Sequence, residues 1–404
     1  MWHLALKNIS RNKKRTFFSA LTIFIATVAV IAFLAMENGM FESITENAIN
    51  HTAGNINIKT KLYDEHERVM PLQFYIPSTS ALSDKIESID GVESTSRKTS
   101  IPVAIYLGDD NKNAMAIGVD LNNDRFFGDE SREYFEGTMP EEGSKDVIIT
   151  THLAQFLNLK IGDRFTFLSK TATGGSNAIS STITAIISFK DSDLNTNAFY
   201  ISPTTLSSML RMNDGSIEML VYTDGTVSVE DINRAIDDDS LLVQSWKDVS
   251  VIGKMIDFAD VFYGYIKIVF FIMASTVIIN TTMMSVIERR KEAATMIAIG
   301  YSHRWVRNLF LLESAMISVL AAILGTIVGA IIINTAGKAG INMDALGGSA
   351  VEGYGFNTLL YLSLPLSQYL STILYAVVIA IVACIFPTRK ILKLEPAVAL
   401  HDEI

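Results

Sequence analysis

Residues 288–313 read ERRKEAATMIAIGYSHRWVRNLFLLE and separate two long apolar stretches of the chain. Arg289, Arg290 and Lys291 follow the first stretch directly, and basic residues mark the cytoplasmic end of a membrane span. Gly300 suits a left-handed helix C-terminus, and Ser302 can cap the helix that re-enters the membrane. The segment is therefore predicted to be a short cytoplasmic helix held between two spans.

Small and apolar residues fill the middle of this segment, although it lies outside the bilayer. They are Ala293, Ala294, Met296, Ile297, Ala298 and Ile299. Apolar side chains in water need a protein to cover them. We expect a cytoplasmic partner to bind here and to push on the helix.

A helix needs about 20 residues to cross a bilayer core, and four apolar runs come close to this length. The predicted spans are residues 17–36, 268–287, 309–333 and 370–386, and the last could start near Leu366. Lys and Arg gather before the first span, between the second and third, and after the fourth, which places these parts in the cytoplasm. The first run exceeds the length of a signal peptide core, which favours an anchor over a cleaved leader.

The segments between the spans follow from this topology. They are a cytoplasmic interfacial helix at 1–16, an extracytoplasmic stalk and domain at 37–267, a cytoplasmic coupling segment at 288–308, an extracytoplasmic loop at 334–369 and a cytoplasmic tail at 387–404. Short β-branched runs alternate with capped helical stretches in 37–267, which predicts an α+β domain. Chain order suggests that a subdomain at about 120–205 is inserted into one built from the flanking segments. Ser202 and Ser228 are the expected caps of two helices of the domain at 37–267.

Composition and motifs argue against an enzyme. Residues 37–267 hold 35 acidic and 19 basic side chains, so the domain has no electrostatic case for nucleic acid. The chain carries no phosphate-binding loop, no HExxH and no GxSxG motif, and its six histidines are scattered. Cys384 is the single cysteine and lies within the last span. We expect no catalytic residue, no metal and no bound cofactor.

Small and charged residues within the spans predict helix packing. Gly325 and Gly329 lie on a small-residue stripe of the third span, which is expected to pack against the fourth or second span. Glu313 lies about one turn inside the third span. A structural ion pair with Arg307 or a neighbour is favoured over a proton relay.

Apolar and aromatic residues gather where the stalks meet the outer leaflet. Met and aromatic side chains suit varied acyl or peptide surfaces, so this set is a candidate substrate entrance; packing within a dimer is the alternative. The set comprises Leu34, Met36, Met40 and Phe41 before the domain, and Phe258, Phe262, Tyr265 and Val269 after it.

The chain resembles the FtsX-like or MacB-like permeases of ABC transporters, which include the lipoprotein-releasing Lol-type permeases. Residues 4–15 look like the basic N-terminal helix of the family, and residues 288–313 look like its coupling segment. The tail FPTRKILKLEPAVALHDE, with Pro387, Pro396 and Leu400, is similar to the C-terminal signature. GVDL at 118–121 and LAQFLNLKIGDRF at 153–165 are similar to motifs of the outer domain.

This resemblance implies a multi-pass protein of the bacterial inner membrane with type VII ABC architecture. It implies two copies of the permease, or one copy and a paralogue, with a separate cytoplasmic ATPase subunit under each, because the sequence shows no ATP-binding loop of its own. The ATPase-coupling residues would be Glu288, Arg289, Glu292, Met296, Ile297, Ala298, Ile299 and Gly300.

Lipoprotein extraction from the membrane is the leading functional hypothesis, with a lipoprotein or amphipathic cargo and membrane lipid as partners. Two alternatives remain open: a mechanical signal transmitter that activates cell-wall hydrolases, and a permease for peptide or toxin efflux. Replacing Ile297 or Ile299 by Glu should preserve membrane insertion but weaken binding of the ATPase, because the new charge would meet an apolar contact.

Overall fold

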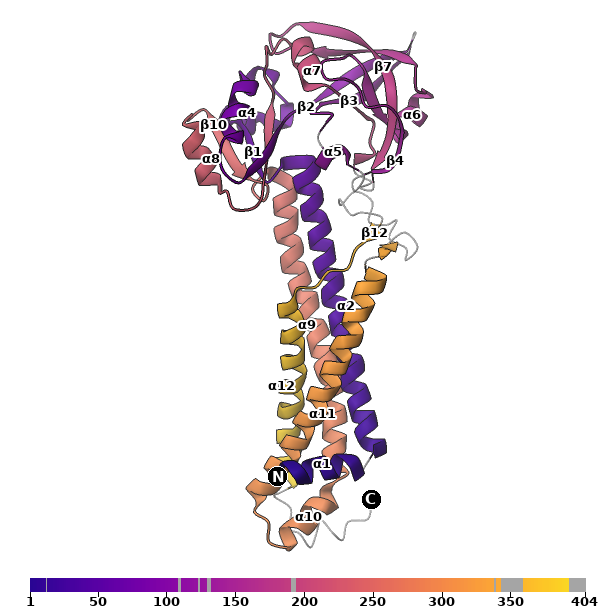
Figure 1. Cartoon of the computed structure of the whole chain (residues 1–404), viewed down its shortest axis with the longest axis vertical. Coiled ribbons are helices and arrows are strands. Elements are labelled where there is room, and N and C mark those ends of the chain that lie inside the picture. Colours follow the sequence, from indigo (N-terminus) through magenta and orange to yellow (C-terminus); the bar gives the residue numbers. More distant parts are fainter. Residues whose placement is uncertain are drawn as a thin grey trace. The chain divides into compact units, whose positions relative to one another are not determined.

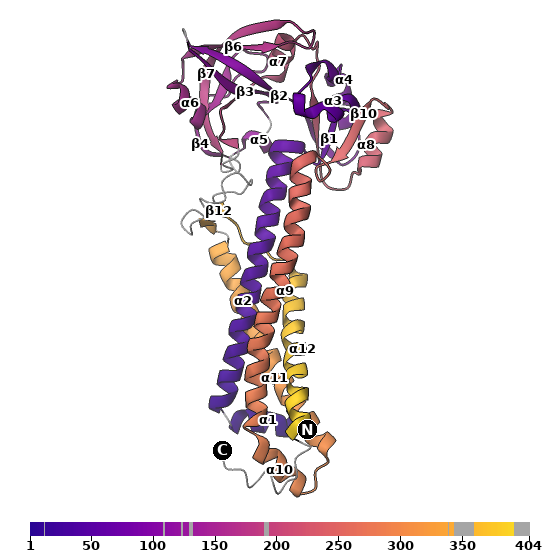
Figure 2. The ribbon, with the colours of Figure 1, turned by 180° about the vertical axis from the view of Figure 1, so that it is seen from behind.

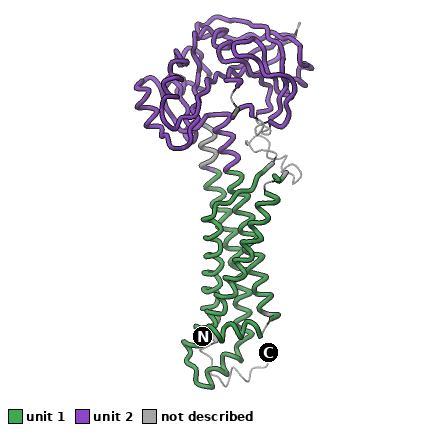
Figure 3. Tube along the Cα trace, viewed as in Figure 1, with its two compact units in different colours: residues 1–41, 259–341, 360–404 green, residues 42–258, 342–359 purple. Residues whose placement is uncertain are grey.

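The computed structural model of the chain describes residues 1–11, 13–107, 110–122, 124–128, 132–189, 194–337, 339–342 and 359–391 (Figure 1). Two compact units divide the chain (Figure 3). The helical unit comprises residues 1–41, 259–341 and 360–404, and the α+β unit comprises residues 42–258 and 342–359. Of the residues used for the family resemblance, Pro396 and Leu400 lie outside the described residues.

Long apolar helices run side by side in the helical unit, as the two opposite views show (Figures 1 and 2). Its elements are α1 (Trp2–Arg11), α2 (Lys13–Asn47), α9 (Ser250–Ile287), α10 (Arg290–Ala298), α11 (His303–Ile332), the π-helix η5 (Ile333–Gly337) and α12 (Leu366–Ile391). Within the described part of the chain, four helices are long and apolar enough to cross a membrane: Thr16–Ala53, Phe258–Ile287, His303–Gly337 and Leu366–Arg389. The prediction of four spans is confirmed, and the last helix does begin at Leu366.

The third and fourth spans pack on each other as predicted, through Ala322 of α11 and Ala376 and Ala380 of α12, and the glycines of α11 approach the first span as well. A Cβ atom on Gly325 would lie 2.9 Å from the Cβ of Thr27, and one on Gly329 would lie 2.8 Å from Cγ2 of Ile31. Both glycine contacts are with α2, a partner that the sequence analysis did not name for this stripe. The missing side chains let the α2 and α11 backbones come close, as small residues do between membrane helices.

The α+β unit consists of short helices and a mixed sheet. Its helices are η1 (Ala48–Ala53), α3 (Lys61–His66), η2 (Glu67–Val69), η3 (Leu72–Phe74), α4 (Thr79–Glu87), α5 (Asp124–Phe127), α6 (Thr151–Leu157), α7 (Pro203–Leu210) and α8 (Val229–Ile236). Its strands are β1 (Ile56–Thr60), β2 (Val92–Leu107), β3 (Asp110–Gly118), β4 (Arg132–Gly137), β5 (Val147–Thr150), β6 (Arg164–Lys170), β7 (Ser176–Phe189), β8 (Ala198–Ile201), β9 (Glu218–Thr223) and β10 (Leu241–Ser245). Two-residue strands β11 (Ile341–Asn342) and β12 (Leu359–Leu360) follow.

Strand β2 belongs to two subdomains at once. Its first half pairs with β9 in the order β10-β1-β9-β2, and its second half pairs with β3. From there the pairing continues through β8, β5 and β7 to β6, which pairs again with β2, so six strands close into a ring. Strand β4 extends this ring from β7.

The ring encloses the largest apolar core of the chain. This core joins Ile101 and Val103 of β2 to Phe165, Phe199 and other side chains of the later strands. The inserted subdomain therefore includes β2 and β3 and begins earlier than residue 120, where the sequence analysis placed it. Local patterns indicated most of the strands, but the pairing of β2 with β6 depends on contacts far apart in sequence.

Two predicted helix caps have different outcomes. The Ser228 side chain accepts from the backbone N–H of Asp231, whose carboxylate in turn accepts from the N–H of Ser228, which is a complete capping box. The Ser202 hydroxyl does not cap α7. It accepts instead from the backbone N–H of Gly143 at 2.9 Å, which ties α7 to the loop before β5.

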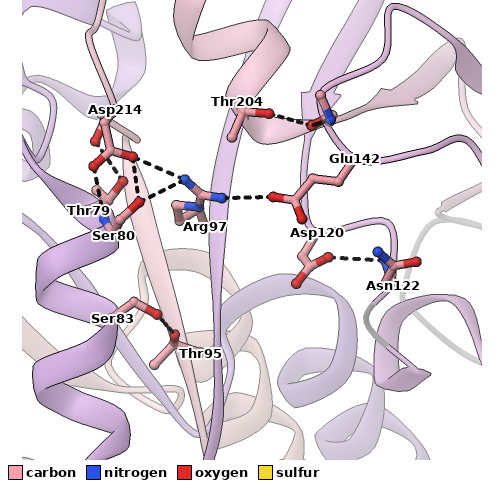
Figure 4. Close-up of polar contacts among 12 residues, drawn as sticks. Thr79, Ser80, Ser83, Thr95, Arg97, Asp120, Asn122, Glu142, Thr204 and Asp214 are labelled. Carbon is pink, nitrogen blue, oxygen red and sulfur yellow. Dashed lines mark hydrogen bonds and ion pairs between the residues drawn. The ribbon is translucent and has the colours of Figure 1, made fainter.

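Arg97 bridges the two subdomains where β2 passes from one to the other (Figure 4). Its guanidinium lies 3.2 Å from the carboxylate of Asp214 and 3.5 Å from that of Glu142. Asp214 also accepts from the hydroxyl of Ser80, at the start of α4. One side chain thus connects segments from both subdomains.

The π-helix η1, which continues α2, is held to the strands β2 and β9 by side-chain donors from both. Lys98 of β2 donates to the carbonyl oxygens of His51 at 3.0 Å and Thr52 at 2.9 Å, both in η1. The hydroxyl of Tyr222 on β9 donates to the carbonyl oxygen of Asn50 at 3.2 Å. These bonds satisfy carbonyl groups that a helix end leaves without an intrahelical partner.

A carboxylate faces Lys98 across the strand pair. Glu218 is its register partner on β9 and is also the partner of Lys59 on β1, so the anion lies between two cations. Burial lowers the pKa of Lys98, against the opposing effect of Glu218. Burial raises the pKa of Glu218, against the opposing effects of Lys98 and Lys59.

Substitution of Lys98 tests this attachment. Lys98→Met should destabilise the full-length protein by about 3 kcal/mol, because two carbonyl groups lose their donor and Glu218 loses a neighbouring cation. Thermal unfolding of the purified chain in detergent measures the effect. Lys145→Met, which changes an exposed lysine of the same unit, is the control, and equal midpoints for the two variants would contradict the attachment.

Candidate functional site

The coupling segment forms a helix with defined ends. Helix α10 ends in a pair of bonds from the N–H of Gly300 to the carbonyl of Ile297, and from the N–H of Tyr301 to that of Met296. Gly300 has a φ of +107°, as this helix termination requires. The Ser302 side chain then accepts from the N–H of Trp305 and caps α11. Both signals read from the sequence are confirmed.

The chain itself covers much of the apolar surface of α10. Ala293 and Ala294 are buried, and Met296 and Ile297 are partly buried against a cluster that includes Val306 and Phe310 of α11. The chain itself covers Ala293 and Ala294, which corrects the sequence analysis for these two residues. The reason is that α10 folds back onto the start of α11.

The end of α10 presents an exposed apolar and aromatic tip. Ile299 is 73% exposed, and Ala298 and Gly300 are exposed beside it. Tyr301 is 43% exposed, and its ring stacks on Trp305 with centroids 4.3 Å apart. Sequence reasoning included Ile299 and missed Tyr301, although an aromatic residue directly after the helix-ending glycine was a readable signal.

Arg289 faces the membrane helices and is only 5% exposed. Its guanidinium forms an ion pair with the buried carboxylate of Glu313, donates to Glu292 at 2.8 Å, and lies 4.4 Å from the ring centroid of Phe310. The sequence analysis placed Arg289 and Glu292 among residues that contact a partner. The Arg289 side chain joins the start of α10 to Glu313 of α11, and Glu292 pairs with Arg289 and with Arg11 of α1. Glu288, one residue before Arg289, is exposed.

Of the partners that the sequence analysis left open for Glu313, the structure places Arg289 against it and not Arg307. The guanidinium of Arg307 donates to Oδ1 of Asn308 at 3.4 Å. The structural ion pair was correctly inferred, but the cation comes from the turn between α9 and α10. A cavity of about 20 Å³ beside the pair has room for about one water molecule, which is too small for a cargo.

The structure divides the candidate entrance residues into two groups. On α2, Leu34 and Met40 are buried, Phe41 is partly buried and Met36 is 37% exposed. On α9 all four are exposed, with fractions of 74% for Phe258, 53% for Phe262, 67% for Tyr265 and 56% for Val269.

Tyr263 is the contact that sequence reasoning missed. Its hydroxyl lies 3.6 Å from the sulfur of Met40, and its ring meets Phe41 edge to face at 5.7 Å. Tyr263 therefore contacts Met40 and Phe41 of α2 from within the chain. The four candidate residues of α9 lie on a separate, exposed stripe. Their spacing of four, three and four residues matches the repeat of a helix face that packs along another helix.

The described residues contain no group of three or more His, Cys, Asp or Glu side chains that could hold a metal ion. Near the coupling segment, Arg289 is paired with Glu313 and Glu292, and Glu292 lies near Arg11. The arrangement can therefore hold helices together and present an exposed tip.

Two family models match the chain. The model described as MacB-like periplasmic core domain matches residues 16–239, and the model described as FtsX-like permease C-terminal matches residues 265–396. The first match alone covers more than half of the chain. The chain belongs to the FtsX-like and MacB-like permeases. It has four candidate transmembrane helices and a large extracytoplasmic α+β domain, consistent with the type VII ABC architecture.

Named relatives agree with this assignment. ABC transporter permease YtrF of Bacillus subtilis (strain 168) is 26% identical over 207 residues, which cover 49% of this chain and 46% of YtrF. Macrolide export ATP-binding/permease protein MacB of Haemophilus ducreyi is 34% identical over 128 residues, covering 31% of this chain and 16% of that protein. The alignments thus span less than half the length of these curated relatives.

A solved structure, the periplasmic region of MacB from Actinobacillus actinomycetemcomitans, shows a weaker similarity. It is 11% identical with a TM-score of 0.36, and the match covers 50% of this chain and 92% of that one. A similarity of this size carries no argument beyond the family matches. Those matches make this FtsX/MacB-type chain an ABC transporter permease.

Proposed function

We propose that this permease transmits motion of cytoplasmic ATPase subunits to its extracytoplasmic domain and thereby releases lipoproteins from the inner membrane of a bacterium. The exposed tip of α10 and the turn after it carries this proposal, because an apolar surface outside the spans needs a protein to cover it. Lys and Arg flank the same ends of the spans, which supports cytoplasmic termini and a cytoplasmic α10. ATP would be bound by the partner subunits.

The second partner in this proposal is another permease copy or a paralogue. The exposed stripe of α9, from Phe258 to Val269, is long and apolar, and its heptad-like spacing suits a neighbouring helix. The aromatic residues of the stripe that the neighbouring helix does not cover would contact lipid and the acyl chains of a lipoprotein. This arrangement accommodates both interpretations of the entrance residues.

Substitution of Ile299 tests the contact with the ATPase. Ile299→Glu should leave the permease inserted and folded, because the side chain is already exposed, but it should reduce the co-purifying ATPase by about tenfold or more. The amount of ATPase that co-purifies in detergent is the measurement. Ile297 is a poorer choice, since its side chain packs within the chain.

His303→Glu is the matched control for this experiment. His303 is exposed at the start of α11, so the same new charge should have little effect there. Parent levels of ATPase and of lipoprotein release in the Ile299→Glu protein would contradict the proposed docking tip.

Photocrosslinking tests the cargo. A photoreactive residue at position 262 should form adducts with labelled lipoprotein, because Phe262 is 53% exposed. The same group at position 40 should react within the chain, since Met40 is 9% exposed and contacts Tyr263. Adducts at 262 with permease alone would reject extraction and support dimer packing.

One feature favours the second candidate function, a signal transmitter whose domain binds a cell-wall enzyme or adaptor. An open groove of about 540 Å³ lies between α6 and the β4–β7 strand pair, and its lining is mostly apolar. Tyr134 on one side and Leu159 on the other offer contacts for a protein partner. Depletion separates the two functions: accumulation of unreleased lipoproteins supports extraction, whereas defective cell-wall cleavage with normal lipoprotein release supports signalling.

A further inference from the structure

The N-terminal helix α1 is joined to the buried ion pair of the coupling segment. The Nδ2 group of Asn8 donates to Oε1 of Glu313 at 2.7 Å. Arg11 approaches Glu292 at 3.8 Å, and Ala5 is fully buried. Three separate elements, α1, α10 and α11, therefore meet around the guanidinium of Arg289.

We propose that Asn8 is a positioning residue that makes α1 part of the coupling device, so that α10, α11 and α1 move together when an ATPase subunit pushes on the tip. This inference rests on the proposed function. It assigns a mechanical role to α1, which the sequence pattern alone describes as a basic helix at the membrane interface.

The energetics of the cluster favour movement as one body. Separating α10 from α11 would leave the charges of Arg289 and Glu313 buried without a partner, which is far more costly than leaving both in place. The carboxylate of Glu313 accepts from both Arg289 and Asn8. A displacement that preserves the ion pair therefore also carries α1, as long as the bond from Asn8 remains.

The exposed side chains of α1 are consistent with this role. Trp2 is 66% exposed and Leu6 is 53% exposed, so these side chains are available to the membrane interface while Ala5 and Asn8 face the protein. A helix anchored in lipid by its aromatic side and bonded to Glu313 by its polar side would convert movement of α11 into movement along the interface. A lipid-attracted tail would need no hydrogen bond to a buried carboxylate.

The main test places one new charge at two positions of α1. Asn8→Asp sets a carboxylate against that of Glu313, whereas Ser10→Asp adds the same charge at an exposed residue two positions away. In the complex purified with its ATPase, Asn8→Asp should lower lipoprotein released per ATP hydrolysed by about tenfold. The amount of co-purifying ATPase should stay at the parent level, because the tip at Ile299 is unchanged.

An exchange variant distinguishes a positioning role from loss of folding. Combining Asn8→Asp with Glu313→Gln swaps the carboxylate and the amide between the two helices and keeps one hydrogen bond and the total charge beside Arg289. The double variant should recover most of the coupling that the single variant loses. No recovery, or equal coupling for Asn8→Asp and Ser10→Asp, would overturn the proposal.

A second measurement does not depend on the ATPase. Spin labels at positions 6 and 295, both exposed, report the distance between α1 and α10 in the full-length Cys384→Ala chain. The distance distribution should be narrow in the parent and in Ser10→Asp, and broad in Asn8→Asp. If the distributions are equal, the inference fails. If they differ but no ATPase co-purifies with the parent, the proposed function fails and the joint between the helices stands.

Discussion

The buried charge of Arg289 is the constraint around which the coupling segment is organised. Arg289 is only 5% exposed, so its buried charge needs partners that offset the lost hydration. Glu313, Glu292 and the ring of Phe310 are these partners. The ion pair joins the turn between α9 and α10 to α11. The tip at Ile299 and Tyr301 stays exposed, whereas Ala293 and Ala294 are buried and Met296 and Ile297 pack against α11.

Features with local signals could be predicted from the sequence. The four spans follow from apolar length, and the ends of α10 and α11 follow from Gly300 and Ser302, since each depends on residues within one or two helical turns. Most strands of the domain were recognised for the same reason. Strands β4, β8 and β10 were missed. Strand β8, Ala198–Ile201, is buried on both faces and lacks the alternation that identifies half-buried strands.

Features that depend on tertiary contacts could not be predicted. Glu313 lies only six residues from Arg307, yet its partner Arg289 is 24 residues away, across the α10 turn. The glycines of α11 indicated close packing without naming the helix that approaches them, which is α2. The exposed stripe of α9 and the buried Met40 were indistinguishable by composition, because lipid-facing and protein-facing residues are equally apolar in a membrane protein.

The proposed transmission depends on helices that continue beyond the membrane. Helix α2 runs from Lys13 to Asn47 and continues in η1, whose last carbonyls are held by Lys98 and Tyr222. Nucleotide-dependent movement of the domain is therefore the most direct test of the account. A spin label at position 145 of the Cys384→Ala chain, in a complex that holds its ATPase, reports the distance between two permease copies. The account predicts that trapping the ATPase with ATP and vanadate shifts this distance; an unchanged distribution in a complex that hydrolyses ATP would contradict it.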